Sequence, residues 1–205
     1  MLSYRSTEEQ DTTVGADVTD AIEFAAYIED EWKISSAFKV NAGMHASAFL
    51  VENHWYTSVQ PRISSRYLLT DELSLKASFS TMAQFVHLLT NAGLGLPTDL
   101  WVPSTARVPP QQSWQAALGL ARTYKGMYEI SLEAYYKEMT NLIEYKDGAS
   151  FINVNEDWQN KVATNGVGES YGTELRLQKK SGKVTGWVGY TLSWTNRQFA
   201  TLNFG

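Results

Sequence analysis

Residues 57–85 read TSVQPRISSRYLLTDELSLKASFSTMAQF, and this stretch decides the fold. Apolar and polar side chains alternate along 57–69 and again along 73–85, with the turn TDE at 70–72 between them. Successive side chains of a β-strand point to opposite faces, so the alternation predicts two strands joined by a short turn. One face is apolar, and the other carries long cations, amides and hydroxyls. Such a two-faced sheet suits either a soluble core or a membrane barrel around a hydrated lumen.

The same alternation continues on both sides of this hairpin. It predicts eight strands in four hairpins within residues 21–195, with short turns at 35–36, 70–72, 125–127 and 180–183. The apolar rows run for about 14 residues, whereas strands of soluble domains usually have roughly 3–10 and a membrane-crossing strand needs about 9–11. This length favours a membrane barrel.

The connections between the predicted strands alternate in length. Those at 51–56, 86–112 and 146–168 are longer than the four turns, and the last two are much longer. In an antiparallel sheet all the short turns then lie at one end and all the long loops at the other. Outer-membrane barrels have this pattern, with short periplasmic turns and long extracellular loops.

Aromatic side chains gather near both ends of the apolar rows. The strand pattern places six of them there, with Trp32, Tyr67 and Tyr128 at the short-turn end and Phe24, Trp114 and Trp194 at the long-loop end. Amphipathic aromatic rings are favoured at the two interfaces of a bilayer, whereas a soluble core does not require them at strand ends. We therefore predict that these six residues are membrane-interface aromatics.

The composition excludes several classes of function. The 205 residues have a net charge of −5 and no basic block, which argues against a nucleic-acid partner. There is no cysteine, and His45, His54 and His87 lack the spacing of metal ligands, so we expect no metal site and no cofactor. Glu29 and Glu31 lie two apart on one strand face, which is typical of a hydrated wall rather than of paired catalytic carboxylates. We therefore predict that the protein is not an enzyme.

Four segments resemble the barrel of TonB-dependent outer-membrane receptors, and most of all the versions found in Bacteroidetes-type bacteria. They are PRISSRY at 61–67, LTNAGLGLPTDLWVPST at 89–105, EAYYKEMTNLIEYKDG at 133–148 and SYGTELRLQKKSGKVTGWVGYTLS at 170–193. The resemblance implies an all-β, antiparallel transmembrane barrel of about 22 strands with a plug domain in its lumen. This chain would supply eight of those strands and no plug.

The resemblance also implies a domain layout and a set of partners. Residues 1–205 would be part of the barrel domain, with a loop at 1–20, eight strands at 21–195 and the beginning of the next loop at 196–205. The implied function is energy-coupled uptake of a nutrient ligand, either a chelated metal such as a siderophore or an oligosaccharide. The implied location is the outer membrane of a Gram-negative, Bacteroidetes-like cell. The implied partners are outer-membrane lipid, the TonB energy-transducing complex acting through the plug, and a surface lipoprotein.

The long loops supply the candidate ligand contacts, because binding chemistry usually lies on loops held by a rigid scaffold. Polar and aromatic side chains of the two longest loops form this set: His87, Asn91, Asp99, Trp101, Arg107, Phe151 and Trp158. A purely structural role, in which the first loop folds over the barrel rim, is the alternative. Charged side chains of the polar strand faces would line the lumen and face the plug: Glu29, Glu31, Lys39, Arg62, Arg66, Lys76, Glu133, Lys137, Glu174 and Arg176. We expect acids and cations to alternate around the lumen.

A second class of function is compatible with the residues alone. Eight antiparallel strands can close by themselves into a binding protein, either a lipocalin-like cup or a small outer-membrane barrel. The cup needs its apolar face inside and its charges outside. The small barrel needs a first strand that pairs with the last.

Overall fold

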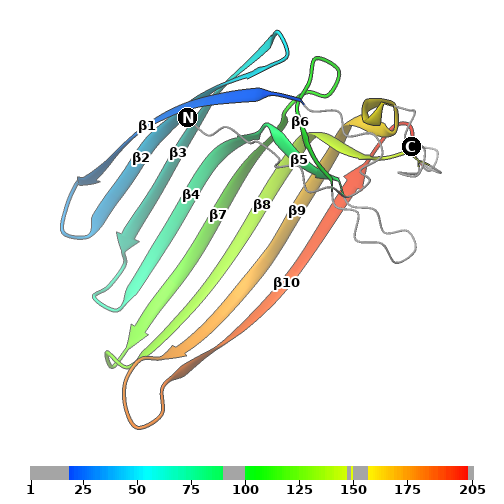
Figure 1. Ribbon diagram of the computed structural model, residues 1–205. Helices are drawn as coiled ribbons and strands as arrows, with labels where there is room; N and C mark the ends of the chain where they lie inside the picture. Colours follow the sequence, from blue (N-terminus) through cyan, green and yellow to red (C-terminus); the bar gives the residue numbers. More distant parts are fainter. Residues whose placement is uncertain (1–18, 90–99, 147–148, 150–156, 203–205) are drawn as a thin grey trace.

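The computed structural model shows eight long strands side by side in one curved sheet (Figure 1). It describes residues 19–89, 100–146, 149 and 157–202. The long strands are β1 (Ala21–Lys33), β2 (Phe38–Val51), β3 (His54–Leu68), β4 (Leu73–Gln84), β7 (Gln111–Tyr124), β8 (Tyr128–Tyr145), β9 (Val162–Lys179) and β10 (Gly186–Gln198). Two short strands, β5 (Val86–Leu89) and β6 (Leu100–Pro103), and a 3₁₀ turn, η1 (Trp158–Asn160), complete the described secondary structure.

The large sheet is antiparallel and has the order β1-β2-β3-β4-β7-β8-β9-β10, while β5 and β6 pair only with each other. The all-β, antiparallel class predicted from the alternation is confirmed. In the part of the chain that the structure describes, no helix has the length and apolar character needed to cross a membrane.

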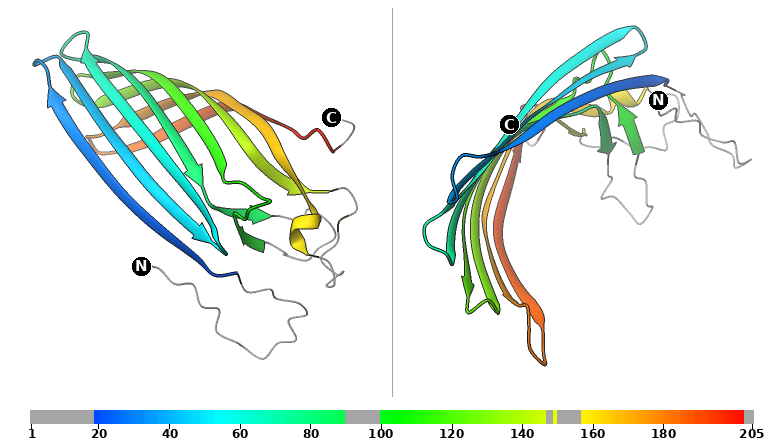
Figure 2. Two further views of the ribbon diagram at one scale, coloured as in Figure 1. Left: turned by 90° about the horizontal axis from the view of Figure 1, so that it is seen from above. Right: turned by 90° about the vertical axis from the view of Figure 1, so that its left-hand side faces the viewer.

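The register keeps the polar and apolar rows on separate faces across the whole sheet. Asn41 of β2 lies opposite Ser64 of β3, and the next pair, Ala42 and Ile63, points to the other face. The sheet curves like a trough, and the β5–β6 hairpin lies on its concave side (Figure 2). The polar rows line the concave side. Large apolar side chains such as Leu118 are exposed on the convex face, and an apolar surface of this extent needs an apolar partner outside the sheet.

The connection expected as a loop at 51–56 is instead a two-residue turn. Val51 pairs with His54, and Glu52 between them has a φ of 52°, in the left-handed region. The alternation fades at the end of β2 because Phe49 and Val51 are apolar although they belong to the concave face. They are buried there against Phe85, which follows β4. These two positions are therefore apolar because they pack against Phe85 and are not exposed to solvent.

The two longest connections also differ from the prediction of unstructured loops. The segment 86–112 contains the β5–β6 hairpin, and β9 begins at Val162, well inside the expected loop 146–168. The last residues of β8 and the first residues of β9 bury apolar side chains on both faces, Ile143 and Val162 among them. The alternation that would identify these residues as strand is therefore lost. At the other end of the chain, β10 runs to Gln198, beyond the predicted limit at 195.

One seam of the sheet is shorter than the others. β3 and β4 pair over 7 residue pairs, from Arg62–Ser80 to Leu68–Ser74, whereas β1 and β2 pair over 13. Pro61 is the first β3 residue beyond this ladder, and proline cannot donate a ladder hydrogen bond. Past β4 the chain turns inward, and the ring of Phe85 stacks on Phe49 with centroids 5.0 Å apart.

The eight strands do not close into a barrel of their own. β1 and β10 are the two edges of the large sheet and do not pair with each other. The charged side chains lie on the concave face, which is the reverse of the lipocalin-like arrangement. Both forms of the stand-alone alternative therefore disagree with the structure.

Candidate functional site

The concave face of the sheet forms a polar trough. The register places all ten predicted lumen charges on this face: Glu29, Glu31, Lys39, Arg62, Arg66, Lys76, Glu133, Lys137, Glu174 and Arg176. Glu31 forms an ion pair with Lys39 (3.6 Å), and Glu29 accepts a hydrogen bond from Asn41 (2.7 Å). Their contact with a plug stays a prediction.

The expected alternation of acids and cations around the trough is wrong at one level of the sheet. Lys33, Lys39, Arg66 and Lys76 lie directly opposite one another on β1, β2, β3 and β4. The row continues through Gly119 to Glu133 and Glu174, which are also opposite each other. The offset between neighbouring strands is fixed by the whole ladder of backbone hydrogen bonds. The pairing of the strands, and not the spacing of charges along one strand, therefore decides which charges share a row. Counting charges along each strand, as the sequence allows, does not reveal which residues share a row.

A cap folds over the long-loop end of the trough; we define it as β5, β6, residues 104–110 and η1. Its core contains Leu89, Val102 and Val108, which pack against Ile143 of β8 and Val162 of β9. Full burial of one such aliphatic side chain contributes about 1.5–3 kcal/mol. This small core explains why a segment rich in glycine, proline and polar residues contains an ordered hairpin.

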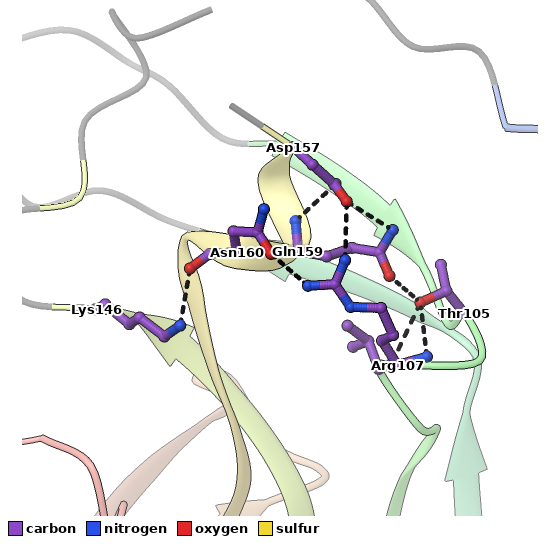
Figure 3. Close-up of polar contacts among 7 residues, drawn as sticks. Thr105, Arg107, Lys146, Asp157, Gln159 and Asn160 are labelled. Carbon is purple, nitrogen blue, oxygen red and sulfur yellow. Dashed lines mark hydrogen bonds and ion pairs between the residues drawn. The ribbon is translucent and has the colours of Figure 1, made fainter. Parts of the chain in front are cut away.

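A polar clamp holds the two parts of the cap together (Figure 3). Arg107 donates to the Asp157 carboxylate (3.1 Å) and to the side-chain oxygen of Asn160. Asp157 also caps η1 by accepting from the backbone N–H of Gln159 (3.0 Å), and the Gln159 side-chain oxygen accepts from the Thr105 hydroxyl (2.6 Å). The clamp joins segments separated by 50 residues in the chain.

Three further hydrogen bonds attach the cap to the wall. The Tyr56 hydroxyl on β3 donates to the carbonyl oxygen of Thr105 (2.7 Å). On β8, the Asn141 side-chain amide donates to the Pro110 carbonyl (3.0 Å). Lys146, just past β8, donates to the Asn160 carbonyl (2.8 Å). The cap is therefore tied to both sides of the trough.

His87, a predicted ligand contact, lies inside the cap. Its side chain is fully buried, and its Nε2 lies 2.9 Å from the Ser104 hydroxyl. Burial lowers the pKa of His87 from its ordinary value of 6.5 to about 4, because the charged imidazolium would lose its hydration. In this conformation a ligand cannot reach the ring, so its role as a ligand contact stays a prediction that requires the cap to open.

Trp101 is the predicted ligand contact that the structure presents most openly. Its side chain is 64% exposed and lies opposite Leu88 on the outer face of the β5–β6 hairpin. Val86 and Pro103 form the neighbouring pair on the same face. The other face of the hairpin is buried against the cap core. The exposed face, which we name the hairpin platform, is therefore an apolar surface at the mouth of the trough.

The remaining loop candidates fall into three groups. Arg107 is occupied by the clamp, although part of its side chain remains exposed. Trp158 is half-buried against the cap core. Asn91, Asp99 and Phe151 lie outside the described residues. Their roles as ligand contacts stay predictions.

Aromatic rings follow one another across the convex face below the cap. Phe79, Trp114, Tyr136, Tyr171 and Trp194 form a continuous row over five strands, with centroids 5.4–6.4 Å apart. All six aromatics predicted from the sequence also lie on the convex face: Phe24, Trp32, Tyr67, Trp114, Tyr128 and Trp194.

The amino-acid sequence of this two-faced, capped sheet matches the model of a known protein family. Residues 3–204 match the family model described as "TonB dependent receptor-like, beta-barrel". The chain belongs to this family. The predicted receptor resemblance is thereby confirmed at the level of the family, while the Bacteroidetes type is not distinguished. No curated protein matches the chain.

Solved TonB-dependent receptors share the fold of this receptor-family chain. The FrpB iron transporter from Neisseria meningitidis (F3-3 variant) aligns with 91% of the chain and 27% of its own length, at a TM-score of 0.63 and 13% identity. The ferric-catecholate import receptor Fiu from Escherichia coli K12 aligns with 88% of the chain and 28% of its own length, at a TM-score of 0.62 and 13% identity. The alcaligin outer-membrane receptor FauA from Bordetella pertussis aligns with 87% of the chain and 31% of its own length, at a TM-score of 0.58 and 16% identity. The chain thus spans less than a third of the length of these receptors.

Sequence reasoning about this receptor barrel missed most of the clamp. An Asp157 side chain before a short helical turn is a recognisable capping signal, and it would have placed η1. Asn141 has a φ of 56°, and asparagine tolerates that region, but nothing in the sequence marks its bond to Pro110. Tyr56 and Thr105 carry no local signal, because their contact joins residues 49 positions apart.

Proposed function

We propose that the chain forms part of the wall and the outer cap of an energy-coupled uptake receptor in the outer membrane of a Gram-negative cell. The observation that carries the proposal is the cap, which is bonded over one end of a polar trough whose convex face is apolar. This arrangement suits a wall that meets lipid outside and encloses a hydrated passage. The convex aromatic row would then lie at the outer bilayer interface.

The proposed ligand is a nutrient, either a chelated metal such as a siderophore or an oligosaccharide, which is captured at the hairpin platform. Similar folds described as an iron transporter, a ferric-catecholate import receptor and an alcaligin receptor support the chelated metal. Exposed Trp101 beside Leu88 suits either class, because an aromatic face stacks on chelate rings and on sugar rings alike. Asn91, Asp99 and Phe151 are proposed as further contacts in the same loops.

In the proposed mechanism no residue of this chain performs covalent chemistry. The cap and plug hold the ligand, and the trough charges face the plug. The TonB complex then displaces the plug, so that the ligand passes along the trough. The proposal also includes a surface lipoprotein partner and a Bacteroidetes-like host. Both rest on the resemblance of the four sequence segments to receptors of Bacteroidetes-type bacteria.

The test uses the complete receptor in a Gram-negative host that lacks its own iron receptors. The probes are radioactive ferric hydroxamate and catecholate chelates and a panel of fluorescent oligosaccharides. We expect Trp101→Ala to weaken binding of one probe class by about tenfold or more, because exposed aromatic anchors dominate binding. Trp55→Ala is the matched control, since Trp55 is also exposed but lies on the convex face.

Uptake of the bound probe should stop when the TonB protein is deleted, while binding remains. The proposal is overturned if no probe binds, or if uptake continues at an unchanged rate without the TonB protein. Equal losses for the Trp101 and Trp55 variants would contradict the hairpin platform as the capture surface.

A further inference from the structure

The cationic row on the concave face is a concentrated positive surface, which we name the basic strip. It consists of Lys33, Lys39, Arg66 and Lys76, one from each of four neighbouring strands. Like charges directly opposite each other on neighbouring strands destabilise a sheet. Among the described residues, the ion pair that Lys39 forms with Glu31 is the only one that involves the strip. Ion pairing within the described wall therefore engages one of the four cations and leaves the strip predominantly positive.

The strip borders a hollow in the trough. This hollow has a volume of about 370 Å³, and Lys39, Arg66 and Lys76 line it together with the polar side chains of Asn41, Ser64 and Ser78. Glu31 also lines the hollow at the β1 side, and Gly119 and Glu133 line it at the far side. Such a surface offers cationic and hydroxyl donors to an incoming carboxylate between two acids, Glu31 on β1 and Glu133 on β8, and Glu31 is already paired with Lys39.

The dimensions of the row indicate the size of the partner. Neighbouring strands lie about 4.8 Å apart, so the strip from Lys33 to Lys76 spans about 14 Å. A single small carboxylate covers a few ångströms and would neutralise one or two of these cations. A folded surface with several carboxylates spaced over the same length can pair with Lys33, Arg66 and Lys76 together and can share Lys39 with Glu31.

We infer that the basic strip is the docking surface for an acidic patch on a polypeptide domain that occupies the lumen. This inference rests on the proposed function, because it requires a lumenal domain. It adds an orientation, since the acidic side of that domain faces β1–β4. Glu133 would disfavour the same acidic side chains beyond β4. The strip thus sets which way the lumenal domain is turned within the wall.

The test measures how firmly the lumenal domain is held in the complete receptor. Protease is added to receptor in outer membranes at rising urea concentration. The midpoint is the urea concentration at which half of the lumenal domain is cleaved. It is recorded at about 50 mM and about 500 mM NaCl, because salt screens exposed charges. We expect the wild-type midpoint to fall at high salt. The Arg66→Glu/Lys76→Glu receptor should have a low midpoint at both salt concentrations, with most of the salt dependence lost.

Lys125→Glu/Lys183→Glu is the matched control, because both lysines lie in short turns outside the trough. It should keep the wild-type midpoints. If charge reversal prevents barrel assembly, seen as loss of heat-modifiable migration, Arg66→Gln/Lys76→Gln gives the same comparison with a smaller shift.

Three results would overturn the inference. A protected lumenal domain whose midpoints ignore the strip variants would contradict docking on the strip and leave the proposed function intact. A wild-type lumen that is open before urea is added would contradict the proposed function and the inference together. Inorganic phosphate that binds wild type but not the reversal variant, with unchanged midpoints, would assign the strip to a small anion.

Discussion

The trough and the cap depend on different kinds of contact. In the trough, each strand is held by a ladder to its neighbour, and an alternation of two residues decides what every side chain faces. In the cap, single side chains such as Arg107 and Thr105 join segments about 50 residues apart. The wall therefore has its stability spread over many equivalent bonds. The cap is held by its small apolar core and by a few side-chain bonds. One substitution can remove such a bond, so the attachment of the cap is more easily weakened than the wall.

The largest effect is expected for a charge on the convex face. Leu118→Arg should destabilise the folded wall by about 2–4 kcal/mol, because a cation near mid-membrane loses its hydration. Gly119→Arg, the adjacent position on the concave face between Lys76 and Glu133, should cost less, because the cation there stays hydrated. The folded fraction of the complete receptor in lipid vesicles, measured by heat-modifiable migration, checks both. Equal losses would contradict the assignment of faces.

The next largest effect is a loss of stability at low pH that is expected in the cap and not in the wall. Unfolded His87 takes up a proton below its ordinary pKa of 6.5, whereas the buried ring does so only near its lowered pKa of about 4. Stability of the cap is therefore complete above pH 6.5 and falls as the pH drops toward 4, by about 1.4 kcal/mol per unit and about 3 kcal/mol in total. Hydrogen exchange of residues 86–89 and 100–108, corrected for intrinsic rates, should show the loss. His87→Gln should abolish this pH dependence and leave the wall unchanged.

A smaller effect is expected at the clamp. Arg107→Ala removes an ion pair and a hydrogen bond that are partly exposed, so the cap should lose about 1–2 kcal/mol. Faster hydrogen exchange at residues 157–161 is the measurement. The control is Arg122→Ala, which breaks an ion pair of similar exposure with Glu72 near a short turn. If the control loosens the cap as much, the clamp has no special role.

The smallest effect is expected at the link between the two regions. Tyr56→Phe deletes the hydroxyl that donates to Thr105 and leaves the ring in place, which should cost about 0.5–1 kcal/mol. The double variant Tyr56→Phe/Arg107→Ala measures whether the link and the clamp act together. Costs that simply add would show that the cap is held to the wall and to η1 independently.

The wall could be predicted from the sequence, and the cap could not. Alternation is a local property, so it placed Arg66, Lys76 and Leu118 on their correct faces without any knowledge of pairing. It failed where a segment is buried on both sides, as at Ile143 and Val162, because both parities are then apolar. It also could not reveal the basic strip, since the offset between strands is set by the ladder. The clamp was hidden because its bonds join distant residues.

The aromatic row has a consequence for where a ligand is first held. Tyr136 belongs to the row, and β8 continues nine residues further to Tyr145, beside the cap. With the row at the outer bilayer interface, as proposed above, about 3.3 Å per residue and a strand tilt of about 40° would place the cap roughly 20 Å outside the bilayer surface. At that height the cap would stand clear of the lipid head groups. A captured molecule would then be held in the aqueous surroundings of the cell and would still have the full thickness of the membrane to cross.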